Sequence, residues 1–153
     1  MENSRSEIFK DVLRLEARAI EHSIDSITDQ QINDLSKIYD RLLASKASLV
    51  FCGVGKSGMI ANKLASTFSS LGLPSWFLHP VEALHGDLGR LSADDALVFI
   101  SKSGETEEIL KLAPFLKTDQ SLIIGLLGLV DSKIAKLCGL VFNCEVEKEA
   151  CIN

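Results

Sequence analysis

The sequence predicts one α/β domain, with a doubly wound, mainly parallel five-stranded sheet flanked by helices and preceded by an N-terminal helical pair. Two observations predict this class. From residue 48 onward, short and nearly unbroken apolar runs alternate with helical stretches, which is the pattern of parallel strands covered on both faces. The chain has 153 residues, of which 46% are apolar and 24% charged, enough for one hydrophobic core. No repeat or linker divides the chain, so we expect a single domain over 1–153.

The first part of the chain is expected to form two helices. Apolar residues recur at helical spacing within 5–25, at Ile8, Val12, Leu15, Ile20 and Ile24. Thr28 begins the sequence TDQQ, a capping box that predicts the start of a second helix. The apolar face of this second helix carries Ile32, Leu35, Ile38, Leu42 and Leu43. The pair brings more apolar surface than one short sheet face needs, which indicates that part of it lies at a subunit contact.

Strands and helices then alternate to the end of the chain. Strands are expected at 48–52, 75–78, 96–100, 121–126 and 140–143. Helices are expected at 57–72, 105–117 and 131–137, and Gly72 and Pro74 end the first of them. In such sheets the ligand binds beyond the carboxyl ends of the strands. Three distinctive segments fall there: 53–58, 79–89 and 101–108.

Composition excludes several classes of function. The net charge of -5 and the pI near 5.2 argue against a general nucleic-acid binder, which needs a basic face. The longest apolar run, 122–130, is too short to span a bilayer, and the N-terminus lacks the apolar core of a signal peptide. We therefore expect a cytoplasmic protein with no membrane contact. The four cysteines form no CxxC pair, and buried free thiols are favoured over a metal site; they are Cys52, Cys138, Cys144 and Cys151.

The segment GVGKSG at 53–58 follows the first strand and has four readings. A nucleotide P-loop is disfavoured because its first glycine would fall on Val50, inside the strand. Gly53, Gly55 and Gly58 satisfy the dinucleotide pattern G-x-G-x-x-G, but no acidic residue stands at the end of the second strand to bind the ribose. A site for one phosphate or a polyol fits the helix start and the adjacent Lys56. A tight turn that needs glycine only for its backbone angles remains the plain alternative.

A second loop shifts the balance toward the single phosphate. In SKSGET at 101–106, three hydroxyl side chains surround Gly104 at the end of the third strand; they are Ser101, Ser103 and Thr106. Small hydroxyls and free amides at a helix start suit three phosphate oxygens. The plain alternative is an ordinary N-cap at Ser103, with Glu105 and Glu107 favoured by the helix dipole.

These motifs resemble the sugar isomerase (SIS) domain family. The resemblance rests on G-x-G-K-S-G at 53–58, on HPVEALHGDLG at 79–89 and on S-x-S-G-E-T at 101–106, and it covers about residues 7–151. The segment 79–89 is the specific part, and with the ending EKEAC at 147–151 it is most similar to the D-arabinose 5-phosphate isomerases. Relative to that family, this chain lacks the last helix of the catalytic domain and any CBS module.

The resemblance implies interconversion of D-ribulose 5-phosphate and D-arabinose 5-phosphate, which supplies Kdo for lipopolysaccharide. It implies a homotetramer with sites near subunit contacts and no cofactor or metal. It places the substrate phosphate on the loop 101–106, which is called the hydroxyl loop from here on. It assigns catalytic roles to a lysine, a histidine and two glutamates. The phosphate-binding residues are Ser57, Ser101, Ser103, Gly104 and Thr106, beside the loop glycines Gly53, Gly55 and Gly58. The catalytic residues are Lys56, His85, Glu108 and Glu149.

The chemistry of aldose–ketose isomerisation fits these residue types. A base must move a proton between C1 and C2 through an enediol, and either Glu149 or Glu108 can supply it; which is acid and which is base stays open. Lys56 would stabilise the enediolate charge, and His85 suits ring opening or proton relay. Glu82 is a candidate to orient His85, whereas His79 is expected to be structural and His22 exposed. Each of the two candidate bases has the alternative of a solvated surface acid.

Two rival functions remain. A non-catalytic phosphosugar sensor would need the loop at 101–106 but not Lys56, His85 and Glu149 together. Another isomerase of the same family, acting on a hexose or heptose phosphate, is disfavoured by the segment 79–89.

Overall fold

A five-stranded, fully parallel sheet forms the centre of the molecule in a computed structural model, which describes residues 4–146 and 148. The strand order is β2-β1-β3-β4-β5. The strands are β1 (Leu49–Cys52), β2 (Ser75–Leu78), β3 (Ala96–Ser101), β4 (Ile123–Leu127) and β5 (Leu140–Asn143). The expected doubly wound α/β class is therefore confirmed, and four strands lie within a residue of their predicted bounds. The fourth is shifted by two residues at its start, because Gln120–Leu122 form a 3-10 turn.

The strand order reverses between β1 and β3, and this places the candidate site. From β1 the chain first moves outward to β2, then crosses back over to β3 and continues to β4 and β5. The register pairs Leu49 with Ser75 on one side and with Ala96 on the other. Loops that leave β1 and β3 at their carboxyl ends therefore diverge at the point where such sheets open a crevice.

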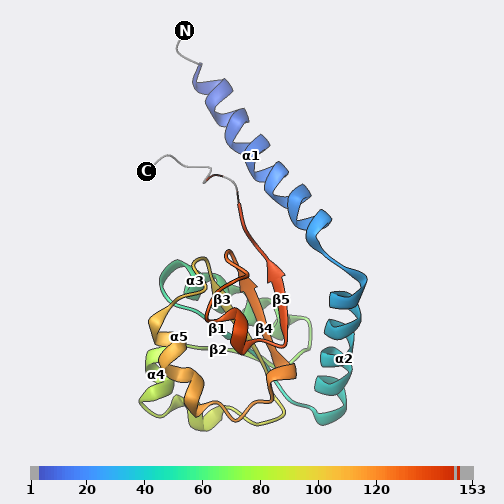
Figure 1. The fold of residues 1–153 in the computed structure, drawn as a ribbon, viewed down its shortest axis with the longest axis vertical. Coiled ribbons are helices and arrows are strands. Elements are labelled where there is room, and N and C mark those ends of the chain that lie inside the picture. The colour runs from blue at the N-terminus through green and yellow to red at the C-terminus, as the bar shows by residue number, and fades with distance from the viewer. Residues whose placement is uncertain (1–3, 147, 149–153) are drawn as a thin grey trace.

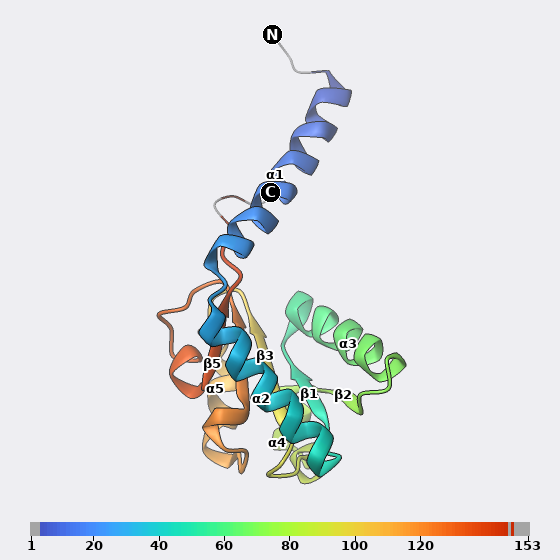
Figure 2. The same cartoon turned by 90° about the vertical axis from the view of Figure 1, so that its right-hand side faces the viewer.

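Helices cover both faces of the sheet. One face carries α2 (Asp29–Ser45) and α3 (Gly55–Ser70), and Figure 2 shows them separated along the sheet. The other face carries α4 (Pro80–Leu84) and α5 (Glu107–Leu112), which pack against each other. The capping box is present at the start of α2, where Thr28 and Gln31 bond each other's backbone amides. Gln31 also donates from Nε2 to the carbonyl oxygen of Val141 at 2.7 Å, which ties α2 to β5.

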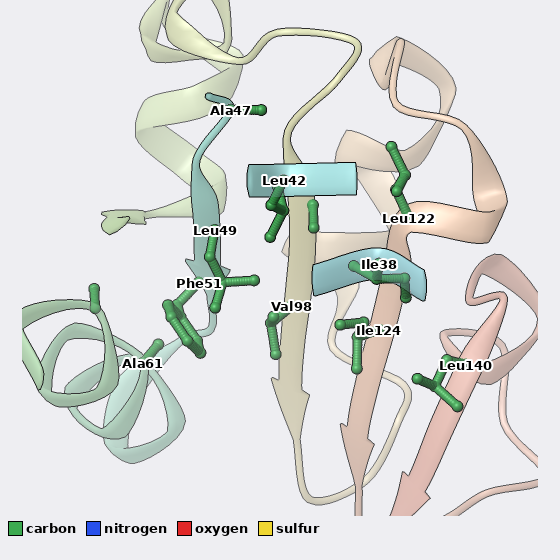
Figure 3. Packing of buried hydrophobic residues seen from close by; sticks show 12 residues of the cluster. Ile38, Leu42, Ala47, Leu49, Phe51, Ala61, Val98, Leu122, Ile124 and Leu140 are labelled. Atoms are coloured by element: carbon green, nitrogen blue, oxygen red, sulfur yellow. The ribbon is translucent and has the colours of Figure 1, made fainter. Parts of the chain in front are cut away.

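Each sheet face has its own hydrophobic core. In Figure 3, Ile38 and Leu42 of α2 lie over Val98 of β3 and Ile124 of β4, while Phe51 of β1 meets Ala61 of α3. The opposite core packs Phe99, Ile109 and Leu112 between the sheet and α5, all fully buried. Burying one such side chain contributes about 1.5–3 kcal/mol, so the two cores together hold the sheet in its observed register.

A wide apolar groove lies between α2 and α3. Its volume is about 520 Å³, its floor includes Phe51, Val98 and Ile124, and its walls include Tyr39 and Phe68. No charged side chain lines it. This face of the sheet is therefore only partly covered by helices.

The first helix projects from the domain. Helix α1 (Arg5–Ser26) contains no buried residue, and Figure 1 shows it extending away from the sheet. The expectation that the helical pair carries surplus apolar surface is thus supported chiefly by α1, whose exposed side chains include Phe9, Ile20 and Ile24.

Two of the expected helices are shorter than predicted. The helix expected at 105–117 is α5 followed by a 3-10 turn, Ala113–Phe115. Pro114 explains the break, because it lacks an N–H and cannot continue the α-helical ladder. The helix expected at 131–137 is only a 3-10 turn, Ala135–Leu137. Conversely, α3 begins two residues before its predicted start, at Gly55.

The cysteines differ in exposure. Cys52 and Cys138 are buried, as expected, and burial raises the pKa of each thiol to about 12. Cys144 is exposed, so the prediction that it is a buried thiol is wrong. The reason is that β5 ends at Asn143, and the next residue leaves the core. Cys151 lies outside the described residues.

We expect a thiol reagent such as N-ethylmaleimide to modify Cys144 in the native protein and to leave Cys52 and Cys138 unmodified. The reason is accessibility: partial burial raises the pKa of the Cys144 thiol as well, but only Cys52 and Cys138 are closed off from the reagent. Peptide mass spectrometry after brief labelling, with and without urea, measures this. Native labelling of Cys52 as fast as Cys144 would contradict the packing.

Candidate active site

The segment 53–58, called the glycine loop from here on, joins β1 tightly to α3. A Cβ on Gly53 would lie 2.9 Å from the backbone of Ser57, and one on Gly58 would lie 2.8 Å from the carbonyl oxygen of Gly53. Gly55 adopts φ 59°, a left-handed conformation that glycine adopts readily. The loop glycines thus have structural roles of their own, as the plain alternative requires.

The start of α3 also has features of an anion site. Val54 occupies the N-cap position, and no side chain caps the helix. The first amides of a helix have no partner within it, so the N–H groups of the first turn, which includes Lys56 and Ser57, point outward at the positive end of the helix dipole. Lys56 is exposed and Ser57 half-buried.

The loop at 101–106 is folded around the Ser101 hydroxyl. Its Oγ accepts the N–H of Gly104 at 3.0 Å and lies 2.8 Å from Oγ1 of Thr106. Ser101 is only 2% exposed, so its hydroxyl orders the loop from inside. Ser103 is exposed, and its Oγ accepts the N–H of Glu105 at 3.2 Å.

The plain alternative, an N-cap at Ser103, is not what the structure shows. The N-cap position of α5 belongs to Thr106, whose side chain makes no capping bond. The difference follows from Gly104, whose φ of 64° turns the chain once more before the helix can begin. The loop therefore presents the Ser103 hydroxyl ahead of the helix, and the first amides of α5 have no side-chain cap.

A segment distant in sequence holds this loop in place. The N–H of Ile134 donates to the carbonyl oxygen of Gly104 at 3.0 Å. Glu105 accepts the N–H of Lys133 at 2.9 Å and pairs with the Lys133 ammonium at 2.7 Å. These bonds attach residues 104–105 to the segment after β4. The hydroxyl loop is therefore held at its start by β3, which ends at Ser101, and near its end by these bonds.

The side-chain hydrogen bond from Lys133, followed by the backbone bond, lowers the pKa of Glu105 below its ordinary value of 4.5. A lowered pKa means that this contact stabilises the fold above pH 4.5, and that its contribution disappears as the pH falls through the folded value. We expect Lys133→Met to raise the Glu105 pKa toward 4.5, measured by NMR titration of its side-chain carboxyl carbon. Lys136→Met is the matched control and should leave it nearly unchanged, since Lys136 contributes least. Equal shifts in both variants would refute the local contact.

A pocket opens at the carboxyl edge of the sheet and joins the ends of four strands. Its volume is about 440 Å³. Ser57 follows β1, Ser101 ends β3 and Gly128 follows β4. The full lining is Ser57, Ile100, Ser101, Lys102, Gly128, Cys144, Glu145 and Val146. Of the predicted phosphate-binding residues, the structure brings Ser57 and Ser101 to this cavity, whereas Ser103, Gly104 and Thr106 do not line it.

The expected catalytic side chains lie around the strand reversal but do not line this pocket. Lys56 begins α3 on one sheet face, and Glu108 lies in the first turn of α5 on the other. His85 is exposed at the end of α4, and its Nδ1 lies 2.8 Å from the carbonyl oxygen of Val81. In the described part of the chain, these three make no hydrogen bond or ion pair with one another. Glu149 lies outside the described residues.

The remaining candidates are placed as follows. Among the described residues, the Glu82 carboxylate makes no hydrogen bond to the His85 ring; the partner of that imidazole is the backbone carbonyl of Val81. A neutral imidazole that donates from Nδ1 keeps Nε2 free as an acceptor. His79 caps α4 by accepting the N–H of Val81, which agrees with a structural role, and His22 is exposed.

Sequence reasoning missed several pocket residues. Lys102 and Gly128 lie just beyond expected strand ends. The rule that ligands bind beyond the carboxyl ends of parallel strands could have found them. Cys144, Glu145 and Val146 follow β5, which the sequence analysis did not connect to the site. Across residues 4–146 and 148, no three His, Cys, Asp or Glu side chains are placed to hold a metal ion. Within the same residues, no helix is both long and apolar enough to cross a membrane.

The fold and the loops at the carboxyl edge of the sheet define a class of protein. It consists of doubly wound parallel α/β domains in which a glycine loop and a hydroxyl-rich loop flank the strand reversal. A model of the SIS domain family matches residues 42–153. The chain belongs to the SIS domain family.

Named relatives make the resemblance more specific. The arabinose 5-phosphate isomerase KdsD of Escherichia coli K12 is 40% identical over 137 residues, which cover 89% of this chain and 42% of that protein. KdsD of Pseudomonas aeruginosa is 39% identical over 129 residues, covering 84% and 40%. A solved structure from Escherichia coli CFT073, in complex with arabinose 5-phosphate, has a TM-score of 0.81 at 39% identity and covers 99% of this chain and 79% of that one. The chain thus spans about two fifths of the curated relatives it matches.

Proposed function

We propose that this chain is the isomerase domain of an arabinose 5-phosphate isomerase, which interconverts D-ribulose 5-phosphate and D-arabinose 5-phosphate for Kdo and lipopolysaccharide synthesis. The single observation that carries the proposal is the pocket in which Ser57 and Ser101 meet at the strand reversal. The relatives named for this reaction, and the solved relative in complex with arabinose 5-phosphate, support the choice of sugar.

In this proposal the phosphate binds between the two loops. The Ser103 hydroxyl, the uncapped amides of α5 and the first amides of α3 supply donors to its oxygens. The Ser101 hydroxyl accepts the Gly104 N–H and bonds the Thr106 hydroxyl, so the role of these two side chains is chiefly to preorganise the loop. Lys56 adds a positive charge, which offsets the net charge of -5 locally.

Holding the sugar by its phosphate orients C1 and C2 for proton transfer. Glu108 or Glu149 abstracts the proton, and Lys56 stabilises the oxygen where negative charge develops. His85, with Nε2 free, opens the sugar ring or relays a proton. The proposed assembly is a homotetramer with sites near subunit contacts, where a neighbouring copy can supply groups that do not line the pocket of one chain.

The proposed domain organisation is one SIS domain over 1–153. A phosphosugar sensor is the second candidate. The observation that favours it is that Lys56, His85 and Glu108 do not line the pocket, whereas the hydroxyl loop is ordered by its own hydrogen bonds and by one from Lys133. A sensor needs only that loop.

Proton exchange followed by NMR tests the proposal. The protein is incubated with D-arabinose 5-phosphate in deuterated water. Conversion to ribulose 5-phosphate, with deuterium on the reacting carbon, is expected of an enediol isomerase. Binding without exchange in this chain and in a form as long as the relatives would favour the sensor. Exchange only in the longer form would mean that the enzyme needs residues beyond 153.

A further inference from the structure

An apolar stripe on α1 faces away from the rest of the domain. It consists of Phe9, Leu13, Ile20 and Ile24, which are 67%, 50%, 65% and 64% exposed. At 3.6 residues per turn these four lie within roughly 60° of one another around the helix. The side of α1 that meets the domain is a different one: Leu15, Ala19 and His22 line a small cavity with Glu145 and Val146. The chain's own hydrophobic core therefore does not bury the stripe.

A helix in this position needs a partner. Most helical stability in proteins comes from burying an apolar face rather than from intrinsic propensity, and α1 buries no residue over its 22 residues. Contiguous exposed apolar surface of this kind marks an interaction site. The stripe itself indicates which partner fits.

The stripe is complementary to itself when two copies run antiparallel. With a two-fold axis between Glu16 and Ala17, Phe9 of one copy lies opposite Ile24 of the other, and Leu13 lies opposite Ile20. Each large apolar side chain then meets another, and each contact occurs twice, as an isologous interface requires. This match follows from the spacing alone, because 9 and 24 are symmetric about the same point as 13 and 20.

The charges beside the stripe favour the same arrangement. Lys10 and Arg14 flank it in the N-terminal half, while Glu21 and Asp25 flank it on the same side in the C-terminal half. Antiparallel pairing sets the same flank of both helices side by side, and so brings Lys10 and Arg14 of one copy near Glu21 and Asp25 of the other. Among the described residues, Glu21 and Asp25 form no ion pair.

The ion pairs within α1 do not oppose this pairing of two copies. Lys10 contacts Glu7 at 2.9 Å and Arg14 contacts Asp11 at 2.8 Å, both within one turn and both exposed. Exposed pairs of this kind contribute little to stability, so the two cations can also serve acidic groups of another chain.

We propose that α1 pairs antiparallel with α1 of a second copy, through the stripe and in the register just described. The proposal specifies the surface for the self-association in the proposed function, but it does not depend on isomerase activity.

The first test measures mass in solution by sedimentation equilibrium. The variant Leu13→Ser with Ile20→Ser should raise the dissociation constant of self-association at least tenfold. Because both side chains are exposed, circular dichroism should show the domain still folded. Met59→Ser with Leu71→Ser, at residues 74% and 76% exposed on or beside α3, is the control and should associate as the unchanged chain does. Unaltered association of the α1 variant would overturn the proposal.

The second test reads the register by disulfide cross-linking. Leu13→Cys and Ile20→Cys are made separately, both with Cys144→Ser and Cys151→Ser. Mixed and mildly oxidised, the two variants should cross-link to each other and not to themselves. Preferential cross-linking of each variant to itself, or no cross-link in an associated mixture, would overturn the antiparallel pair. Cross-linking between the variants in a chain that fails the isomerase test would leave this proposal standing.

Discussion

Replacing Gly104 by alanine should destabilise the fold and abolish binding of a sugar phosphate. A Cβ at this position would lie 2.1 Å from Oγ and 2.5 Å from Cβ of Ser132, and 3.0 Å from the carbonyl oxygen of Leu129. Ser132 is 2% exposed, so it has no space into which to move. The left-handed φ costs about 1–2 kcal/mol for a residue with a side chain, and overpacking adds about 1–3 kcal/mol. We expect a loss of roughly 2–5 kcal/mol in the free energy of unfolding, measured with urea.

Gly72→Ala separates the two causes of this loss. Gly72 has φ 91°, also left-handed, but an added Cβ there meets nothing within 4 Å. The control should cost only the conformational share, about 1–2 kcal/mol, and should leave ligand binding unchanged. If both variants lose the same free energy of unfolding, the close approach of Gly104 to Ser132 makes no separate contribution to stability. If Gly104→Ala still binds D-arabinose 5-phosphate normally, the loop is not the phosphate site.

Glu108→Gln should slow isomerisation about 10²–10⁴-fold, the usual contribution of a positioned acid or base. The amide keeps the shape of the side chain but cannot take up a proton. Glu108 is half-buried in the first turn of α5, which begins directly after the hydroxyl loop, and the proposed function assigns its carboxylate to the proton transfer. The measurement is the rate of deuterium incorporation in a preparation with activity, together with the binding constant for the sugar phosphate, which should change much less.

Glu107→Gln is the matched control for Glu108. Glu107 is the preceding residue of the same turn, but it is exposed and its carboxylate pairs with Lys111 at 3.1 Å. Its loss should change the rate less than about twofold, because surface ion pairs contribute little. A normal rate in Glu108→Gln would remove Glu108 from the proposed site and leave Glu149 as the base.

Local sequence signals predicted most of the fold. The capping box at Thr28 depends on residues only three apart, and the strands are short apolar runs that hardly any other element resembles. The meeting of the glycine loop and the hydroxyl loop at one edge also followed from the sequence, because parallel strands must end on the same side. These features depend on neighbours in the chain or on a general rule of topology.

What the sequence missed depends on contacts between distant residues. Nothing around Ser132 indicates that it lies against Gly104, and nothing around Lys133 indicates its bond to Glu105. The position of the N-cap of α5 depends on how that turn receives the loop, whereas the early end of α5 follows from the neighbouring Pro114. The exposure of Cys144 likewise depends on where β5 leaves the sheet. Periodicity cannot detect such pairings, because each residue alone fits many surroundings.

The strand order has a consequence for the protein as it is synthesised. The apolar strand β1 leaves the ribosome before either of its neighbours exists, since both β2 and β3 follow it in the chain. At roughly 5–20 residues per second, the interval between Leu49 and Ser101 lasts about 3–10 s. Of the described helices that precede β1, α2 alone carries buried residues, and these belong to the same core cluster as Leu49 and Phe51 of β1. Until β2 and β3 are available to pair with β1, α2 is therefore the described helix that can cover it.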